Sequence, residues 1–264
     1  MIHGTTPSGA QTEEQAARWV RGMFGRITPR YDLLNHLLSF NIDRLWRAHT
    51  VKRVAAILER ADARVLDLCC GTGDLMLALE RKRRAQVLGS DFCHPMLLEA
   101  QRKVERRHFS SKLFEADALA LPLAGGSLDL ITIAFGFRNF ANYRRGLEEL
   151  FRVLRPGGVL AVLEFSQPDN RAMAWAYDFY SKRVMPLVGG MISGSREAYS
   201  YLPESVRKFP DAEELAAEMR SAGFAQVSYE RLTGGVVALH LACTGGASAP
   251  SQHKPLTSKE PADE

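Results

Sequence analysis

Strand-like and helix-like segments alternate through the middle of this chain, and this alternation limits its fold more than any other feature of the sequence. The apolar, strand-like segments are 63–70, 85–91, 112–117, 127–135 and 157–165. The helix-like segments between them are 74–84, 95–108 and 142–154. Strands joined through helices run parallel, because each connection must return across a face of the sheet. Several of these strands are apolar almost throughout, which indicates that helices cover both faces.

The last two strand-like segments, 226–232 and 235–244, follow a different pattern. They are separated only by Thr233 and Gly234. So short a link permits a hairpin but no crossover helix, so this final pair is antiparallel. We therefore predict a doubly wound α/β fold, with a seven-stranded sheet that ends in a C-terminal antiparallel hairpin.

The remaining segments surround a single core domain. Residues 12–61 predict a helical extension ahead of the sheet, and residues 170–222 predict a helical insertion between the fifth and sixth strands. The core domain then spans 62–243. Residues 1–11 are small and polar, and residues 244–264 mix Gly, Ser, Pro and charged residues, so we expect both ends to be disordered.

Composition and charge exclude several classes of protein. The 264 residues include 34 Lys and Arg against 30 Asp and Glu, a net charge of +4 that is too small to demand nucleic acid. No run of 18 apolar residues predicts a membrane span, and the N-terminus lacks the basic start and apolar run of a signal peptide. The four cysteines form no CxxC pair. We expect a cytoplasmic protein with free thiols.

The loop after the first strand, VLDLCCGTGD at 65–74, has the glycines of a nucleotide-binding turn. The dinucleotide pattern GxGxxG would need a third glycine where Met76 stands. Asp74 would also repel a pyrophosphate at the helix N-terminus. S-adenosylmethionine has no phosphate and carries an ammonium and a sulfonium, which the carboxylates of Asp67 and Asp74 would attract. The loop therefore favours S-adenosylmethionine as the cofactor.

Acidic residues also end the second and third strands. Asp91 lies where an acid hydrogen-bonds the ribose hydroxyls of a bound nucleotide, and Asp117-Ala118 suits the adenine edge. A metal is the alternative suggested by Cys69 and Cys70. Neighbouring residues of a strand point to opposite faces, and no Cys or His cluster supplies further ligands, so we predict no metal site.

Several longer motifs resemble one family. They are FGRITPRYDLLNHLLSFNIDRLW (24–46), VLDLCCGTGD (65–74), DALALP (117–122), ITIAFGFRNF (131–140), LRPGGVLAVLEFSQP (154–168) and YSYLPESVRKFP (199–210). They resemble the ubiquinone/menaquinone-biosynthesis C-methyltransferases (UbiE-like). VLDLCCGTGD indicates only the class I S-adenosylmethionine-dependent methyltransferase superfamily, whereas FGFRN, LEFS and YSYLPES are far more specific. The resemblance covers roughly residues 20–243, and so makes 62–243 a methyltransferase domain.

The resemblance implies that Thr72, Asp91, Asp117 and Ala118 contact the cofactor. Some family members have a serine contact where this chain has Ala134, which offers only its backbone. The absence of that serine favours an enzyme acting on the menaquinone precursor alone. Together, the loop and the resemblance predict the cofactor-binding residues Asp67, Gly71, Thr72, Gly73, Asp91, Asp117, Ala118 and Ala134.

The family's reaction adds a methyl group to a ring carbon of a polyprenylated hydroquinone. Such a transfer needs alignment and a deprotonated ring hydroxyl rather than a metal. The candidate catalytic residues are Arg138, Asn139, Tyr31, Tyr201 and Glu164. Arg138 is too basic to accept the proton but can stabilise a phenolate. A tyrosine, a carboxylate or a water molecule removes the proton, and the sequence leaves these three alternatives open.

The insertion around residues 172–192 is rich in aromatic and apolar residues, with basic residues interspersed. It is either ordinary helix core or a channel for the prenyl tail that opens at the membrane surface. The second interpretation predicts peripheral contact with the inner face of the membrane. The basic runs 81–84 and 102–108 are interpreted as solvated helix ends, and patches for lipid or nucleic acid are the less favoured alternative.

Two other functions are compatible with the sequence. One is a class I methyltransferase that acts on another lipid or a small phenol, and the other is a non-catalytic scaffold of quinone biosynthesis. The mild charge and the absence of a basic aromatic stripe argue against an RNA substrate. The prenyl length and the oligomeric state are not encoded in any motif we find.

Overall fold

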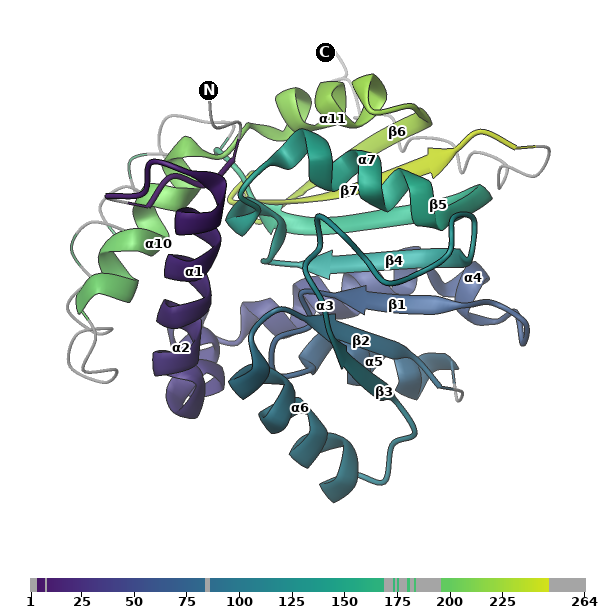
Figure 1. The fold of residues 1–264 in the computed structure, drawn as a ribbon, viewed down its shortest axis with the longest axis horizontal. Helices are drawn as coiled ribbons and strands as arrows, with labels where there is room; N and C mark the ends of the chain where they lie inside the picture. The colour runs from purple at the N-terminus through teal and green to yellow at the C-terminus, as the bar shows by residue number, and fades with distance from the viewer. Residues whose placement is uncertain are drawn as a thin grey trace, which may run out of the picture.

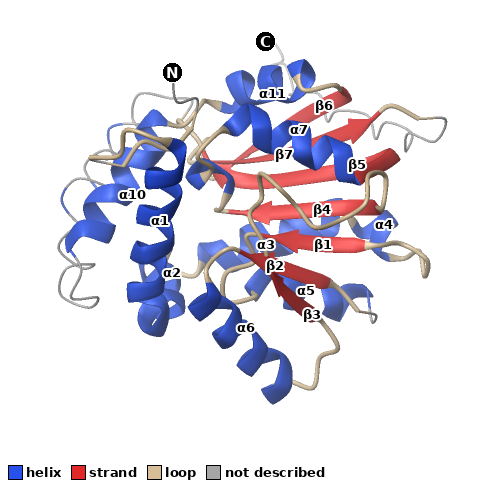
Figure 2. Cartoon of the chain, viewed as in Figure 1, coloured by secondary structure: helices blue, strands red, loops and turns tan. Residues whose placement is uncertain are grey.

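A seven-stranded sheet forms the centre of the molecule, with helices on both faces (Figures 1 and 2). The computed structural model describes residues 4–7, 9–83, 86–168, 173, 175, 180, 183 and 196–246, with backbone alone for 196–200. The strands are β1 (Val65–Leu68), β2 (Leu88–Asp91), β3 (Lys112–Glu115), β4 (Leu128–Ala134), β5 (Leu154–Phe165), β6 (Phe224–Leu232) and β7 (Val237–Thr244). Their order in the sheet is β3-β2-β1-β4-β5-β7-β6.

The sheet confirms the predicted topology. Strands β1 to β5 are parallel, and β7 pairs antiparallel with both β5 and β6. The chain order reverses between β1 and β4, which are neighbours although two strands separate them in sequence. A crevice forms beyond the carboxyl ends of the strands at such a switch point, and ligands of doubly wound sheets bind there.

Two apolar clusters fill the space between the sheet and its helices. On one face, α7 (Tyr143–Val153) and α11 (Ala212–Ser221) contribute Leu147, Leu150 and Leu215 to the core. On the other face lie α3 (Ile42–Arg53), α4 (Ala55–Leu58) and α5 (Asp74–Arg83). Helix α6 (His94–Arg106) crosses between β2 and β3. Coverage on both faces explains why the central strands are apolar throughout.

The N-terminal helices close the carboxyl end of the sheet. They are α1 (Glu13–Ile27), the 3-10 turn η1 (Thr28–Arg30) and α2 (Tyr31–Leu38). Helices α3 and α4 follow in the chain and cover one face of the sheet. A capping box between Thr12 and Gln15 starts α1. Helices α1, α2 and α10 (Arg196–Lys208) lie together at the ends to which the arrows of the parallel strands β1 to β5 point (Figure 1). Their shared apolar side chains form a third, smaller core that includes Val20, Leu34 and Tyr201.

Three details differ from the sequence-based expectations. The last hairpin has a four-residue connection, 233–236, because Thr233, Gly234 and Gly235 all take positive φ angles before β7 begins. Strand β5 begins at Leu154, where that residue pairs with Leu128 before a register shift. The N-terminus is not loose around Thr5, since its N–H donates to the carbonyl of Phe140 at 2.8 Å and its side chain is buried.

Parts of the predicted insertion and tail fall outside the described residues. Of the proposed channel segment 172–192, the structure describes only Met173, Trp175, Tyr180 and Arg183. The C-terminal tail is described as far as residue 246. Within the described part of the chain, no helix is both long enough and apolar enough to cross a membrane.

Candidate active site

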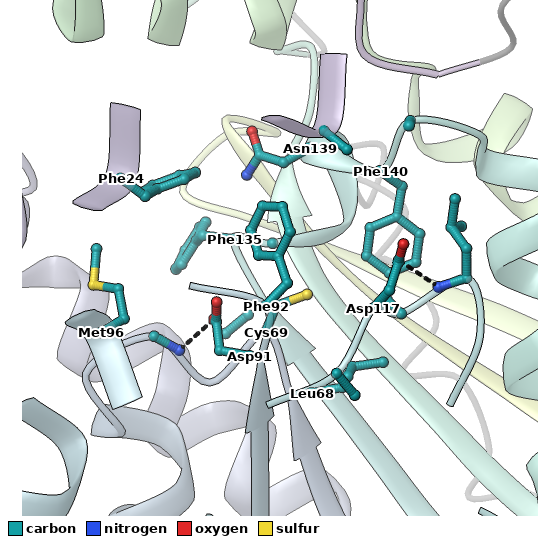
Figure 3. Close-up of a pocket in the computed structure, with 18 of the residues that line it drawn as sticks. Phe24, Leu68, Cys69, Asp91, Phe92, Met96, Asp117, Phe135, Asn139 and Phe140 are labelled. Atoms are coloured by element: carbon teal, nitrogen blue, oxygen red, sulfur yellow. Dashed lines mark hydrogen bonds between the residues drawn. The ribbon is translucent and has the colours of Figure 1, made fainter. Parts of the chain in front are cut away.

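The ends of four neighbouring strands line a narrow cavity of about 70 Å³, which we call the first cavity (Figure 3). Leu68 and Cys69 come from the end of β1, and Asp91 ends β2. The segment 116–118 follows β3, and 134–136 follows β4. Figure 3 shows the rings of Phe24, Phe92 and Phe135 gathered between Asn139 and Asp91. This cavity occupies the switch point of the sheet, where a doubly wound fold binds its nucleotide.

Gly71 and Asp91 form the rigid rim of the first cavity. The Gly71 N–H donates to Asp91 Oδ2 at 2.9 Å, and the Cys93 N–H donates to Asp91 Oδ1 at 2.9 Å. Gly71 has a φ of 55°, a left-handed conformation that glycine adopts without strain. Burial raises the pKa of Asp91 to about 6. The carboxylate is held in place, and its remaining lone pairs can accept hydrogen bonds from ligand hydroxyls.

Three more of the predicted cofactor-binding residues line the first cavity. They are Asp117, Ala118 and Ala134. Asp117 Oδ1 accepts from the Leu119 N–H at 2.9 Å, which holds its carboxylate at the end of β3. No lysine or arginine is among the described residues that line this cavity, so its walls offer carboxylates, the Tyr31 hydroxyl, the Asn139 amide, main-chain groups and apolar surface. These wall groups suit a cationic nucleoside and do not suit a phosphate.

Asp67, Thr72 and Gly73, which are also predicted to bind the cofactor, are not among the residues that line the two cavities. Asp67 is buried, accepts from Thr132 Oγ1 at 2.6 Å, and has its pKa raised to about 7 by burial. Gly73 has a φ of 89°, and a Cβ there would lie 3.1 Å from Met76 Cε. We therefore expect these residues to influence cofactor binding through the shape and the charge of the loop.

A buried lysine ties the loop to the N-terminal helices. Lys103 Nζ lies 2.6 Å from Asp32 Oδ2 and 2.8 Å from Asp74 Oδ1, and Thr72 Oγ1 donates to Asp32 Oδ1 at 2.5 Å. Burial raises the pKa of Asp74, but Lys103, together with Arg47 and His36, more than offsets this and leaves the pKa below its usual range. The sequence-based interpretation of 102–108 as a solvated helix end is therefore wrong at Lys103, which is buried. Its place on the apolar face of α6, beside Ala100 and Val104, was the available signal.

A larger, mainly apolar cavity of about 350 Å³, the second cavity, lies beneath α1, α2 and α3. Its described lining includes Met23, Ile27, Leu38, Phe40, Trp46 and Phe165. Phe24, Tyr31 and Phe135 line both cavities and so mark their junction. Phe135 has a φ of 59°, an unfavourable conformation for a bulky residue, and such strain clusters at functional sites.

Arg138 and Glu164 form a buried ion pair beside the second cavity. Arg138 Nη1 donates to Glu164 Oε1 at 2.8 Å and to the Phe135 carbonyl at 2.6 Å. Arg138 lines the second cavity, whereas Glu164 is 1% exposed and lines neither cavity. Arg138 Nε has no hydrogen-bond partner among the described residues, so the guanidinium keeps an unused donor. Glu164 therefore positions Arg138 and does not face the crevice as the sequence suggested.

Tyr201 and Asn139 connect the two cavities by a hydrogen bond. The Tyr201 hydroxyl, on the second cavity, donates to Asn139 Oδ1 at 2.9 Å, and Asn139 lines the first cavity. Thr5 Oγ1 lies 2.7 Å from the same hydroxyl. Burial raises the pKa of Tyr201 and of Tyr31. Both tyrosines are therefore neutral hydrogen-bonding groups at neutral pH.

A second polar group in the larger cavity was missed by the sequence analysis. Asp43 and Arg47 both line this cavity and form an ion pair one helical turn apart on α3. Asp43 also accepts from Ser39 Oγ at 2.6 Å and lies 2.9 Å from His36 Nδ1. The spacing of Asp43 and Arg47 is that of an ordinary exposed helix pair. Only the packing of α3 against the sheet turns the pair inward.

Fold and site together define the class of protein. The cavity at the switch point offers Asp91 and Asp117 to hydroxyl and amino groups, and Gly71 allows close backbone approach. An adjoining apolar cavity can hold an acceptor beside the bound nucleoside. Among the described residues, no three His, Cys, Asp or Glu side chains lie together as metal ligands. This arrangement is that of a class I S-adenosylmethionine-dependent methyltransferase.

The comparison with known families is more specific. The chain belongs to the ubiE/COQ5 methyltransferase family, whose model matches residues 10–244. A demethylmenaquinone methyltransferase of Thermus thermophilus is 54% identical over 220 residues, which cover 83% of this chain and 98% of the relative. One of Deinococcus radiodurans is 44% identical, over 83% of this chain and 90% of the relative. The UbiE protein of Dinoroseobacter shibae is 42% identical, over 89% and 95%.

Solved structures share the fold at low sequence identity. A SAM-dependent methyltransferase of Thermotoga maritima matches with a TM-score of 0.59 and 18% identity, over 84% of this chain and 99% of that chain. The [4+2]-cyclase SpnF matches with a TM-score of 0.61 and 18% identity, over 92% and 98%. A cyclase and a methyltransferase sharing one fold show that the fold alone does not determine the acceptor.

Proposed function

We propose that this enzyme methylates a ring carbon of demethylmenaquinol, a polyprenylated hydroquinone, to give menaquinol. The observation that carries the proposal is the junction of the two cavities at Phe24, Tyr31 and Phe135. A methyl donor in the first cavity and an aromatic ring in the second would meet at this junction. The family and its demethylmenaquinone methyltransferase relatives support this choice of acceptor.

The two cavities have separate roles in the reaction, since the first would bind the methyl donor and the second the acceptor. When bound, S-adenosylmethionine supplies a methyl group on a positively charged sulfur. Gly71, Asp91, Asp117 and Ala118 would hold its nucleoside in the first cavity. Cavity walls that align the acceptor carbon with the methyl group can lower the activation free energy by on the order of 7–11 kcal/mol. The narrow junction performs this alignment.

Arg138 stabilises the negative charge that develops on the ring oxygen when its hydroxyl is deprotonated. The guanidinium is fixed by Glu164 and by the Phe135 carbonyl, so it needs no reorganisation during the reaction. Tyr31 and Asn139 orient the ring at the junction, and Tyr201 holds Asn139. The proton passes to a carboxylate or to water, because both tyrosines resist ionisation.

The naphthoquinol is the acceptor that the site favours. Ala134 lines the first cavity and offers no hydroxyl where some family members carry a serine. The second cavity is walled by Trp46, Phe135 and Phe165, whose rings lie 5.9 Å and 5.0 Å apart in succession. Such a wall suits a fused aromatic ring. The 2-methoxy-6-polyprenyl-benzoquinol of ubiquinone synthesis is the second candidate, supported by the UbiE relatives.

We place the enzyme in the cytoplasm, in peripheral contact with the inner face of the membrane, because the proposed acceptor carries a long isoprenoid tail. The tail would leave the second cavity through its apolar walls. The net charge of +4 is too small to demand nucleic acid, and we expect no such partner.

The experiment that tests this function combines purified enzyme, methyl-labelled S-adenosylmethionine and two reduced acceptors, a demethylmenaquinol and a benzoquinol. Label in the naphthoquinol alone is the expected result, and label in both would make the enzyme dual. Cofactor binding without label in either would favour a scaffold, or a methyltransferase for another lipid or small phenol. Short-chain acceptors keep the assay independent of any membrane.

A further inference from the structure

Large exposed apolar side chains concentrate on one short segment of the molecule. Among the described residues they are Leu33, Leu37, Phe40, Leu45, Leu98 and Trp175. Four of these six lie between residues 33 and 45, with exposed fractions of 60% for Leu33, 44% for Leu37, 71% for Phe40 and 68% for Leu45. Single exposed leucines are ordinary, but four within one helix pair form a patch that calls for a partner.

The geometry of the segment places these side chains outward. Leu33 and Leu37 are four residues apart and share one face of α2, while Leu34 and Leu38 on the adjacent face are buried in the third core. Phe40 and Asn41 turn the chain with φ angles of 51° and 60°. The sequence therefore builds α2 with apolar side chains on both its buried and its exposed faces.

The charge of this surface is one-sided. Its exposed residues, from the fully described stretch 29–48, are Pro29, Arg30, Leu33, Leu37, Phe40, Asn41, Arg44, Leu45 and Ala48. None of them is acidic, and two are arginines. Both acids of the stretch are paired with cations: the half-buried Asp32 with Lys103 and the buried Asp43 with Arg47. These nine residues lie on η1, α2, α3 and the turn that joins the two helices, far from the β6–β7 hairpin in sequence. We call them the hairpin face.

The hairpin face is continuous with the second cavity. Phe40 belongs to both, since it lines the cavity and is largely exposed. Its neighbours Leu38, Ser39 and Ile42 also line the cavity. Helix α2 lies at the edge of the molecule beside α1 (Figure 1). A chain-like apolar ligand in the second cavity can therefore reach the surface at the turn between α2 and α3.

We propose that the hairpin face docks on an anionic lipid bilayer, with Leu33, Leu37 and Leu45 inserted among the acyl chains and Arg44 at the headgroups. Apolar side chains framed by basic residues and free of acids bind such surfaces. Docking there would set the mouth of the second cavity against the bilayer. This purpose rests on the proposed function, because a prenylated acceptor resides in that bilayer.

The test is flotation of the full-length protein with vesicles of phosphatidylcholine, with and without phosphatidylglycerol. The variant Leu33→Gln/Leu37→Gln/Leu45→Gln changes no cavity-lining residue and keeps good helix formers. It should lower vesicle binding by at least about tenfold. The matched control, Leu98→Gln, removes an exposed leucine from α6 and should leave binding unchanged. Arg44→Gln should lower binding to the anionic vesicles alone, by about fivefold.

Activity separates this proposal from the proposed function. The triple variant should methylate a short-chain quinol in solution at the parent rate, and should lose activity on a long-chain quinol presented in vesicles. Unchanged vesicle binding by the triple variant, or no binding by the parent protein, would overturn the docking proposal while leaving the short-chain activity to stand. If the parent protein is a dimer that does not bind vesicles, and the triple variant is a monomer, then the hairpin face is instead the contact between two copies of this chain. No methylation of either short-chain quinol would refute the function and not the docking.

Discussion

The two cavities of this enzyme are built in different ways. The first is lined by strand ends and tight turns, and its carboxylates are held by main-chain N–H groups, as Asp91 is by Gly71 and Cys93. The second is roofed by helices outside the sheet, and its charged groups are held by other side chains, as Arg138 is by Glu164. We therefore expect the cofactor, which many enzymes of this fold share, to bind at the strand ends. We expect the acceptor to bind at the helices, which can vary between enzymes of this fold.

The sharpest way to break this division is to replace Arg138, which belongs to the second cavity alone. Arg138→Ala should lower turnover by about 10²–10³-fold, because it removes a preorganised donor to the developing phenolate. Cofactor affinity, measured by calorimetry, should stay near the parent value. Glu164→Gln, which keeps the arginine but loosens its support, serves as the comparison and should have a smaller effect. Equal losses of turnover and cofactor affinity in Arg138→Ala would rule out the assignment.

The converse change is made in the first cavity. Asp91→Asn removes a carboxylate that can accept from the ribose hydroxyls, so S-adenosylmethionine should bind about 10- to 100-fold more weakly. The KM for the quinol should hardly change. Glu115→Gln removes an equal charge from an exposed position on β3 and is the matched control. A quinol KM that rises as much as the cofactor constant would show that the cavities are not separate.

Replacing Lys103 tests whether the N-terminal helices couple substrate binding in one cavity to substrate binding in the other. Lys103→Met removes the cation that holds Asp32 of α2 to Asp74 of α5, so both substrates should bind about tenfold more weakly. Steady-state kinetics with each substrate varied in turn measures both constants. The exposed Lys112 of β3 provides the control Lys112→Met, which should behave as the parent. An effect confined to one substrate would contradict the joining role.

The smallest expected effect is a pH dependence of the first cavity. Burial raises the pKa of Asp91 to about 6 and that of Asp67 to about 7, so both lose their charge as pH falls through this range. The cationic S-adenosylmethionine should therefore bind about threefold more weakly at about pH 5.5 than at about pH 8. S-adenosylhomocysteine lacks the sulfonium and should show a flatter profile, and so should Asp67→Asn with the cationic cofactor. Identical profiles for the two ligands would disprove the electrostatic account.

The same two carboxyls make the stability of the ligand-free protein change in the opposite direction. Their folded-state pKa values lie above the usual carboxyl value, so the folded state binds the proton more tightly than the unfolded state. Stability then decreases as pH rises from about 4 through 6 and 7. Thermal unfolding across this range should show Asp67→Asn more stable than the parent at about pH 8, since the variant buries no charge there.

The sequence predicted the first cavity better than the second. Asp91 and Asp117, both predicted from their places at strand ends, line the first cavity, because the strand ends of a parallel sheet converge at one edge. Glu164 also ends a strand, yet its side chain turns to Arg138 and away from both cavities. The sequence did not predict Asp43 and Arg47 as residues of the second cavity, because their spacing is equally common on a solvated helix. Sequence spacing reports which residues are neighbours along an element, and not which way the element faces.

The sequence by itself determined the strand and helix order, the hairpin at the end and the glycine loop, because each depends on local periodicity and on the length of a connection. Only the tertiary structure decided which side chains meet across long separations. Thr72 and Asp32 are 40 positions apart, and Thr5 and Tyr201 are 196 apart. No local pattern encodes such contacts, since they exist only when α1, α2 and α10 pack over the sheet. That packing buries Lys103, joins the two cavities and leaves the hairpin face exposed.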